Sequence, residues 1–277
     1  FNRADKVCER REENSVFQQK TFCTLVLIST YIVSSVLSAQ SIETAARHAV
    51  LYDLTTDTIL LNKASDVPMP PASMSKLMTV YMVFERLKAG RLSLDDKFVV
   101  SRKAWRKGGS KMFVMVKSRV AVKDLLRGII IQSGNDACIV IAEGISGSED
   151  AFAEEMTLKA KEIGLTNSSF KNSTGWPAVG HYMSARDIAT LSKKLILDFP
   201  EYYKLFSETE FTFGGIKQGN RNPLLYKNFG ADGLKTGHTR ASGYGLAAST
   251  IRKGRRLLLV VNGLNSKRAR GSESARL

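Results

Sequence analysis

The chain has 277 residues, of which 43% are apolar and 24% are charged. This composition is typical of a globular protein of one or two domains with a sizeable core, and it excludes a largely disordered chain. The formal net charge of +15 favours anionic partners. Nucleic acid is not predicted among them, because the sequence shows no zinc-finger spacing, RNA-binding aromatic signature or basic heptad array.

The amino-terminal residues differ in kind from the rest. A polar, partly basic segment runs to Lys20, and an apolar run from Thr21 to Ala39 follows it. This is the layout of a secretory signal peptide with an upstream extension, so residues 1–39 are excluded from the predicted fold. The rival interpretation is an uncleaved membrane anchor, because the run is near the ~18-residue lower limit for a span. Either way we expect an exported chain, in the periplasm or at the outer face of the cytoplasmic membrane.

Cysteine use and charge agree with export. Cys8 and Cys23 precede the predicted cleavage point, which leaves Cys138 alone and excludes a disulfide within the mature chain. Residues 1–39 hold five basic and four acidic side chains, so nearly all of the positive charge lies on the exported part. We expect that charge to face an anionic wall polymer or the membrane surface of the cell envelope.

Hydrophobic patterns in residues 40–277 predict one α+β domain. Apolar runs indicate paired strands at residues 49–52 and 58–61 and at residues 243–250 and 255–262. Between them, helical periodicity predicts helices over residues 73–89, 122–132, 136–143, 149–163 and 185–198. We therefore expect an antiparallel sheet formed by both chain ends, with a helical insert against it. Residues 272–277 indicate a further helix that is cut short, as expected of a C-terminally truncated domain.

Ser73 and Lys76 stand three positions apart where the first predicted helix begins. This spacing places a hydroxyl and an amine on the same helical face. Serine is a poor nucleophile at neutral pH, and a neighbouring base that takes its proton activates it. The backbone N–H groups of a first helical turn can also stabilise an oxyanion. The spacing alone is weak evidence, because Ser168 and Lys171 repeat it after a turn signal.

Two further triplets strengthen this signal. Ser133-Gly134-Asn135 follows an apolar run, and Lys235-Thr236-Gly237 precedes the closing hairpin. Each triplet is expected roughly 0.1 times by chance in a chain of this length. Together the motifs predict a cleft. A strand with Lys-Thr-Gly forms one wall, the Ser73 helix forms the floor, and the Ser-Gly-Asn loop forms the other wall.

The three motifs resemble those of the serine penicillin-recognising enzymes. Within that group, the chain is similar to the low-molecular-mass penicillin-binding proteins that act as D-alanyl-D-alanine carboxypeptidases. The resemblance extends from about Ala45 to Leu277 and implies a β-lactamase/transpeptidase-like fold. It rests on five matching stretches, which are residues 71–79, 133–137, 181–187, 219–222 and 233–239.

The resemblance implies a covalent acyl-enzyme route. Ser73 would attack the peptide carbonyl between two terminal D-alanines, and Lys76 would be the general base. Lys235 would supply a second ammonium that helps to lower the pKa of Lys76. Ser133 and Asn135 would relay a proton toward the leaving amine and hold the substrate amide.

The resemblance also implies a set of substrate contacts. They would come from Thr236, Gly237, His238 and Arg270. The backbone N–H groups of Ser73 and His238 would form the oxyanion hole. Thr236 and Arg270 would bind the free carboxylate of the last D-alanine, with Arg268 as the fallback for the arginine.

The sequence thus predicts a serine-type carboxypeptidase that removes the terminal D-alanine from peptidoglycan stem pentapeptides and is acylated by β-lactam antibiotics. One alternative is a β-lactamase-type hydrolase. A large class of those enzymes deacylates through Glu-x-x-x-Asn, a pattern absent between Ser133 and Lys235, so we expect slow penicillin release. A catalytically idle wall-binding protein is the other alternative, and the intact motifs disfavour it. No cofactor is expected, and no metal, because the three histidines show no ligand spacing.

Overall fold

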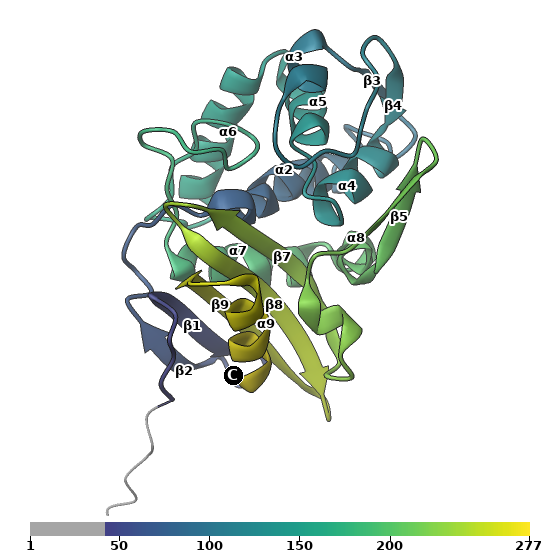
Figure 1. Ribbon diagram of the computed structural model, residues 1–277. Coiled ribbons are helices and arrows are strands. Elements are labelled where there is room, and N and C mark those ends of the chain that lie inside the picture. The colour runs from purple at the N-terminus through teal and green to yellow at the C-terminus, as the bar shows by residue number, and fades with distance from the viewer. Residues whose placement is uncertain (1–41) are drawn as a thin grey trace, which may run out of the picture. The chain divides into compact units, whose positions relative to one another are not determined.

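Both ends of the chain contribute to a five-stranded antiparallel sheet at the centre of the fold (Figure 1). The computed structural model describes residues 42–277, so the predicted signal peptide lies outside the described residues. The strand order is β2-β1-β9-β8-β7. The strands are β1 (His48–Asp53), β2 (Thr58–Lys63), β7 (Ala231–Thr239), β8 (Gly243–Arg252) and β9 (Arg255–Leu264). The predicted α+β fold, with a sheet built by both chain ends, is confirmed.

Strand alternation divides the buried side chains into two cores, one on each face of the sheet. Val50 and Val260 belong to the larger core, which the helical insert covers. Leu51 and Val261 belong to the smaller core beneath α9 (Lys267–Arg276). Because successive side chains of a strand face opposite sides, each apolar strand serves both cores. Figure 1 shows α9 lying on the sheet, where it packs against β8 and β9.

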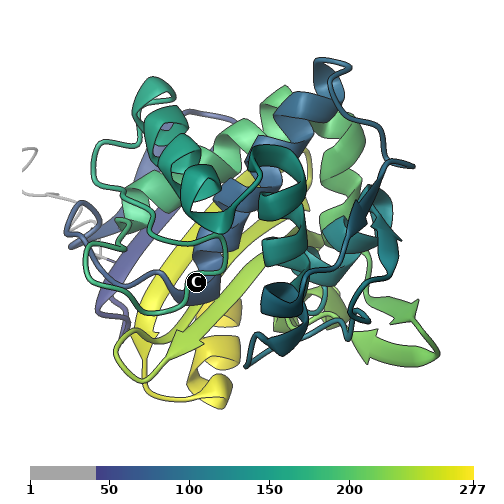
Figure 2. The ribbon, with the colours of Figure 1, turned by 90° about the horizontal axis from the view of Figure 1, so that it is seen from above.

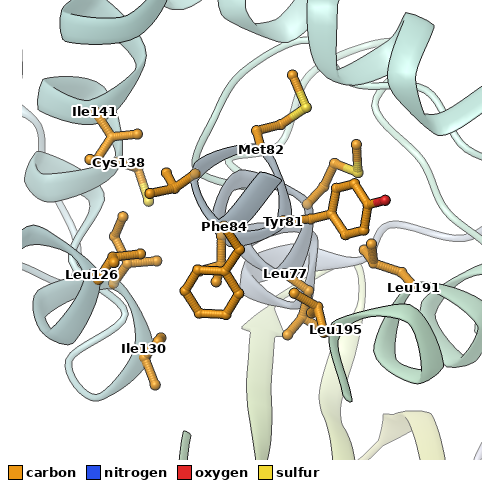
Figure 3. Packing of buried hydrophobic residues seen from close by; sticks show 14 of the residues in the cluster. Leu77, Tyr81, Met82, Phe84, Leu126, Ile130, Cys138, Ile141, Leu191 and Leu195 are labelled. Atoms are coloured by element: carbon orange, nitrogen blue, oxygen red, sulfur yellow. The ribbon is translucent and has the colours of Figure 1, made fainter. Parts of the chain in front are cut away.

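The helix α2 (Lys76–Lys88) is the centre of the helical insert. It contacts four other helices, which are α4 (Val122–Ile130), α5 (Asn135–Ser146), α6 (Glu149–Glu162) and α7 (Ala185–Asp198). Figure 2 shows the helices of the insert lying over the sheet. In Figure 3, Leu126 of α4 lies on one side of α2 and Leu191 of α7 on the other. Every residue from Lys76 to Phe84 is buried, so this part of α2 is enclosed by the rest of the protein. The first turn of α2 is therefore fixed by packing.

The sequence patterns missed the short elements. These are α3 (Arg102–Arg106), α8 (Pro200–Tyr203), β3 (Lys97–Val99), β4 (Arg119–Ala121), β5 (Glu210–Phe213), β6 (Ile216–Gly219), and the 3-10 helices η1 (Ala72–Ser75), η2 (Lys204–Ser207) and η3 (Pro223–Tyr226). Such short segments cannot show a helical or strand period. The helix α9 begins at Lys267, before its predicted start, because its polar sequence has no apolar stripe. Across the described residues, we find no helix with the length and apolar character that crossing a membrane requires.

Phe84 offers a test of the packing around α2. Its side chain is fully buried, and its ring packs edge-on against Phe199 and Phe206. Phe84→Ala should lower the free energy of unfolding by about 3–5 kcal/mol, because the lost transfer energy and the cavity add. Urea unfolding followed by circular dichroism measures the change. Leu158→Ala, at an exposed position of α6, is the control and should cost less than about 0.5 kcal/mol. Equal losses in the two variants would contradict this core.

Candidate active site

Ser73 and Lys76 lie where η1 meets α2. The prediction that Ser73 opens the α-helix is wrong, because Ser73 lies in the 3-10 turn and α2 begins at Lys76. In a 3-10 helix, side chains three positions apart are eclipsed. The tighter turn therefore aligns this pair, and Lys76 Nζ donates a hydrogen bond to Ser73 Oγ at 3.0 Å.

Lys76 is completely buried, although its side chain ends in an amine. Besides Ser73, its Nζ donates to Asn135 Oδ1 at 2.8 Å and to the carbonyl oxygen of Thr174. The three acceptors match the three N–H donors of an ammonium. Burial lowers the pKa of Lys76 to about 8, and the charges of Arg221 and Lys107 act in the same direction. The amine can therefore lose its proton near neutral pH.

Lys235 is the second buried lysine of the site and lies in β7. Burial holds its pKa well below the usual range, and the positive charges of Lys76 and Arg221 lower it further. Its Nζ donates to the carbonyl oxygen of Thr236 at 3.3 Å. The charge of Lys76 thus disfavours the charged form of Lys235, whereas Lys235 is not among the charges that shift the pKa of Lys76.

Gly237 allows β7 to approach η1 closely. A Cβ at this position would lie 2.9 Å from the carbonyl oxygen of Pro71 and 3.3 Å from Ala72 Cβ. A larger residue would therefore push the strand away from the turn that holds Ser73. The next residue, His238, lines the same two cavities as Ser73. The structure thus brings together the two residues predicted to form the oxyanion hole.

Ser133 and Asn135 stand on the opposite wall, where α5 begins. Asn135 is held at both ends of its amide, since Oδ1 accepts from Lys76 and Nδ2 donates to the carbonyl oxygen of Gly108 at 2.8 Å. Ser133 has a left-handed backbone with φ of 61°, a costly conformation that concentrates at functional sites. Among residues 42–277, its buried Oγ has no hydrogen-bond partner. The hydroxyl is therefore available to a bound group.

Asp136 anchors the neighbouring segment to this wall. Its carboxylate accepts hydrogen bonds from the backbone N–H groups of Met112, Phe113 and Val114 at 3.0, 2.9 and 3.3 Å. The anchored segment also carries Ser110, which lines the cleft. The sequence analysis gave Asp136 no role, although an acidic residue in the first turn of a helix is a recognisable signal.

The first cavity at Ser73 is rich in cations. Its volume is about 320 Å³, and its lining residues are Ser73, Ser110, Ser133, Arg221, Thr236, Gly237, His238, Tyr244, Lys267 and Arg270. No carboxylate belongs to this part of the described lining. Arg270 is 5% exposed and reaches the cavity, whereas the fallback Arg268 is exposed and does not line it. Such a cavity suits an anionic group.

Arg221 is a site residue that sequence reasoning missed. It lies within one of the stretches that carry the resemblance, but no role was assigned to it. Its Nη1 donates to Ser110 Oγ at 2.5 Å, which joins the segment before η3 to the opposite wall of the cleft. A contact between residues this far apart in the chain has no local pattern that would reveal it.

A second cavity of about 340 Å³ opens on the other side of Ser73. Its lining residues are Ser73, Gly109, Ser110, Asn135, Thr174, Gly175, Trp176, Pro177, His238 and Thr239. Ser73 and His238 therefore stand at the junction of two cavities. A larger cavity of about 730 Å³ lies between α7 and the β1–β2 hairpin, and none of the motif residues lines it. We place the chemistry at the junction, where the motif side chains converge.

The second Ser-x-x-Lys pair is not a site. Ser168 Oγ is buried and donates to Asp187 Oδ2 at 2.7 Å, while the backbone N–H of Lys171 donates to His181 Nδ1 at 3.2 Å. The hydroxyl is thus engaged by a carboxylate and not by an amine. Burial lowers the pKa of His181 to about 4, so its ring is neutral at pH 7.

Fold and site together define a class, the serine enzymes with the penicillin-binding fold. The crystal structure of penicillin-binding protein 5 from Haemophilus influenzae superposes with a TM-score of 0.84 at 40% identity, covering 87% of this chain and 71% of that one. Penicillin-binding protein D2 from Listeria monocytogenes, solved in the ampicillin-bound form, gives a TM-score of 0.77 at 29% identity, covering 85% of this chain and 96% of that one.

Sequence comparison narrows the class to a family. The family model of the D-alanyl-D-alanine carboxypeptidases, peptidase family S11, matches residues 35–266. D-Alanyl-D-alanine carboxypeptidase DacC of Escherichia coli strain K12 is 40% identical over 263 residues, covering 92% of this chain. The chain therefore belongs to the D-alanyl-D-alanine carboxypeptidase family, and the predicted resemblance is confirmed. It spans 65% of the length of DacC, slightly less than two thirds.

Asp136 provides a test of how the cleft wall is held. Asp136→Ala leaves three N–H groups, two of them buried, without an acceptor, so the free energy of unfolding should fall by at least about 2 kcal/mol. Asp150→Ala is the control, because Asp150 is an exposed aspartate in the first turn of α6 and should cost less than about 1 kcal/mol. Thermal and urea unfolding of both variants measure the difference. A small loss for Asp136→Ala would contradict the anchoring role.

Proposed function

We propose that residues 40–277 form the catalytic domain of a serine-type D-alanyl-D-alanine carboxypeptidase. It removes the terminal D-alanine from peptidoglycan stem pentapeptides through an acyl-enzyme, and β-lactams acylate the same serine. The observation that carries the proposal is the 3.0 Å hydrogen bond between Lys76 Nζ and Ser73 Oγ, because it pairs a nucleophile with a buried amine that deprotonates readily. Family membership supports the choice of substrate.

The reaction follows from the positions of the side chains. The neutral amine of Lys76 takes the proton of Ser73 as Oγ bonds to the carbonyl carbon of the penultimate D-alanine. The N–H groups of Ser73 and His238 donate hydrogen bonds to the developing oxyanion, a contribution of ~3 kcal/mol per donor in comparable enzymes. The carbon–nitrogen bond then breaks, and Ser133 relays a proton to the leaving amine. Water hydrolyses the ester and restores the serine.

The cationic cavity favours a substrate with a free carboxylate at its end. Arg270 and Thr236 line it, together with Arg221, and Arg270 is 5% exposed. A guanidinium binds a carboxylate through two parallel hydrogen bonds, and burial strengthens that interaction. The terminal D-alanine of a stem pentapeptide carries such a carboxylate next to the bond that is cleaved. The site therefore supports carboxypeptidase action.

The same proposal includes export and an envelope location. Residues 1–39 have the layout of a signal peptide, and the chain carries a formal net charge of +15. That charge would attract the anionic polymers and membrane surface of the cell envelope, where peptidoglycan is found. Nucleic acid is not a partner in this proposal.

Release of D-alanine from diacetyl-Lys-D-Ala-D-Ala tests the function. Ser73→Ala should lower the rate at least about 1,000-fold, because the nucleophile is lost. It should also abolish labelling by a fluorescent penicillin. Ser168→Ala is the matched control, because Ser168 belongs to the other Ser-x-x-Lys pair and is bound to Asp187 instead. Both activities should survive in that variant.

Three outcomes would contradict the proposal. Labelling that persists in Ser73→Ala would remove the assigned nucleophile. Penicillin labelling of the unchanged chain without any release of D-alanine would favour the idle wall-binding protein. Hydrolysis of nitrocefin at many cycles per second would favour a β-lactamase, whereas the proposed enzyme releases the acyl group slowly.

A further inference from the structure

The assignment of the substrate carboxylate to the first cavity determines which part of the substrate lies in the second. This step rests on the proposed function. If the last D-alanine lies in the cavity with Arg270, the acyl part of the substrate extends from Ser73 in the other direction. It then passes Trp176, which lines the second cavity. The residue before D-Ala-D-Ala therefore meets this wall.

Trp176 is held rigidly although its side chain is partly open to solvent. Asn172 Oδ1 accepts hydrogen bonds from the backbone N–H groups of Thr174, Gly175 and Trp176 at 3.1, 2.9 and 3.1 Å. Asn172 Nδ2 donates to the carbonyl oxygen of Trp176 at 2.9 Å. Gly175 has φ of 77°, and a Cβ there would collide with the carbonyl oxygen of Ala72. The residue itself is 44% exposed, so its ring presents an open surface at the cleft on a loop whose backbone is held by hydrogen bonds.

The ring of Trp176 lies between a backbone and a cation. A Cβ on Gly109 would lie 2.9 Å from Trp176 Cζ3, so the ring packs directly on the backbone of the opposite wall. Lys107 Nζ lies 4.8 Å from the ring centroid, within the range of a cation–π interaction. The lysine thus lies against an aromatic ring that lines the second cavity, although Lys107 is not itself a lining residue.

Lys103, within α3, and Lys107, directly after it, have different partners. Lys103 Nζ pairs with Glu149 at 3.1 Å. Within residues 42–277, no carboxylate lies within ion-pair distance of Lys107. An aromatic face leaves the N–H donors of an ammonium free to bind an anion, because it offers no directional acceptor.

We propose that Lys107 and Trp176 form a subsite for an acyl donor with a negatively charged side chain on the residue before D-Ala-D-Ala. The methylene groups of that side chain pack on the indole, and its terminal carboxylate binds the ammonium of Lys107. The subsite determines which acyl donor is preferred and takes no part in bond making or breaking. Lys107 and Trp176 are therefore specificity residues.

Three peptides that differ only in the charge of one side chain test the subsite. They are Nα-acetyl-Lys-D-Ala-D-Ala with the lysine Nε free, acetylated or succinylated, which makes the side chain cationic, neutral or anionic. The unchanged chain should release D-alanine with the highest kcat/KM from the succinylated peptide. Lys107→Gln should lower the succinyl-to-acetyl ratio of kcat/KM roughly three- to fivefold, the size expected of a partly exposed ion pair. The lower kcat/KM for the succinylated peptide should come from a higher KM, with kcat unchanged.

Two further variants complete the test. Trp176→Leu should reduce the same ratio, because it removes the surface that holds Lys107 in place. Lys97→Gln is the matched control and should keep the ratio, since Lys97 is an exposed lysine of β3 outside both cavities. It also separates a local effect from a general attraction of anions by the positive chain.

Each remaining outcome counts against the proposal. Equal losses for all three peptides in Lys107→Gln would show that the lysine acts on the cleft wall or on the pKa of Lys76, and not on the acyl donor. An unchanged ratio in Lys107→Gln, or an equal drop in Lys97→Gln, would remove the subsite. Release of D-alanine without a preference for charge contradicts the subsite alone, whereas failure to release D-alanine from any of the three contradicts the proposed function.

Discussion

The site depends on an amine that is fully withdrawn from solvent beneath a serine. Lys76 is completely buried, and its three acceptors come from η1, from α5 and from the loop that contains Thr174. Burial of a charge is costly unless the group is paired, so the same enclosure both lowers the pKa and requires these hydrogen bonds. Lys76 therefore joins the floor and a wall of the cleft while it remains able to lose a proton.

The rest of the fold keeps this arrangement in place. The helix α2 is buried around its first turns, so the amine has no freedom to swing toward solvent. Gly237 lets β7 lie against η1, and Asp136 ties the segment with Ser110 to α5. Rigid elements thus support every side of the cleft, and such support is what keeps reacting groups at a productive distance. In the proposed function, the cations that remain bind the carboxylate of the substrate.

The sequence predicted those parts of the molecule that leave a local or repeated pattern. The closing hairpins appear as apolar runs, and α7 was predicted with the bounds that the structure has, because its apolar period is complete. The three motifs located the catalytic candidates. The 3-10 turn at Ser73 was missed, since α-helical and 3-10 spacing are alike over four residues. The contacts of Arg221 with Ser110 and of Lys107 with Trp176 join distant segments, so only the tertiary fold reveals them.

The most direct test of this account is the pH dependence of acylation. In the proposed mechanism the active form of Lys76 is the neutral amine, so the rate at which a fluorescent penicillin acylates Ser73 should fall as the pH is lowered through about 8. Below that value it should fall about tenfold for each pH unit. Lys76→Arg should abolish acylation, because a guanidinium keeps its proton. A rate that does not change with pH in this range, or an active Lys76→Arg variant, would contradict the central claim that a buried amine activates the serine.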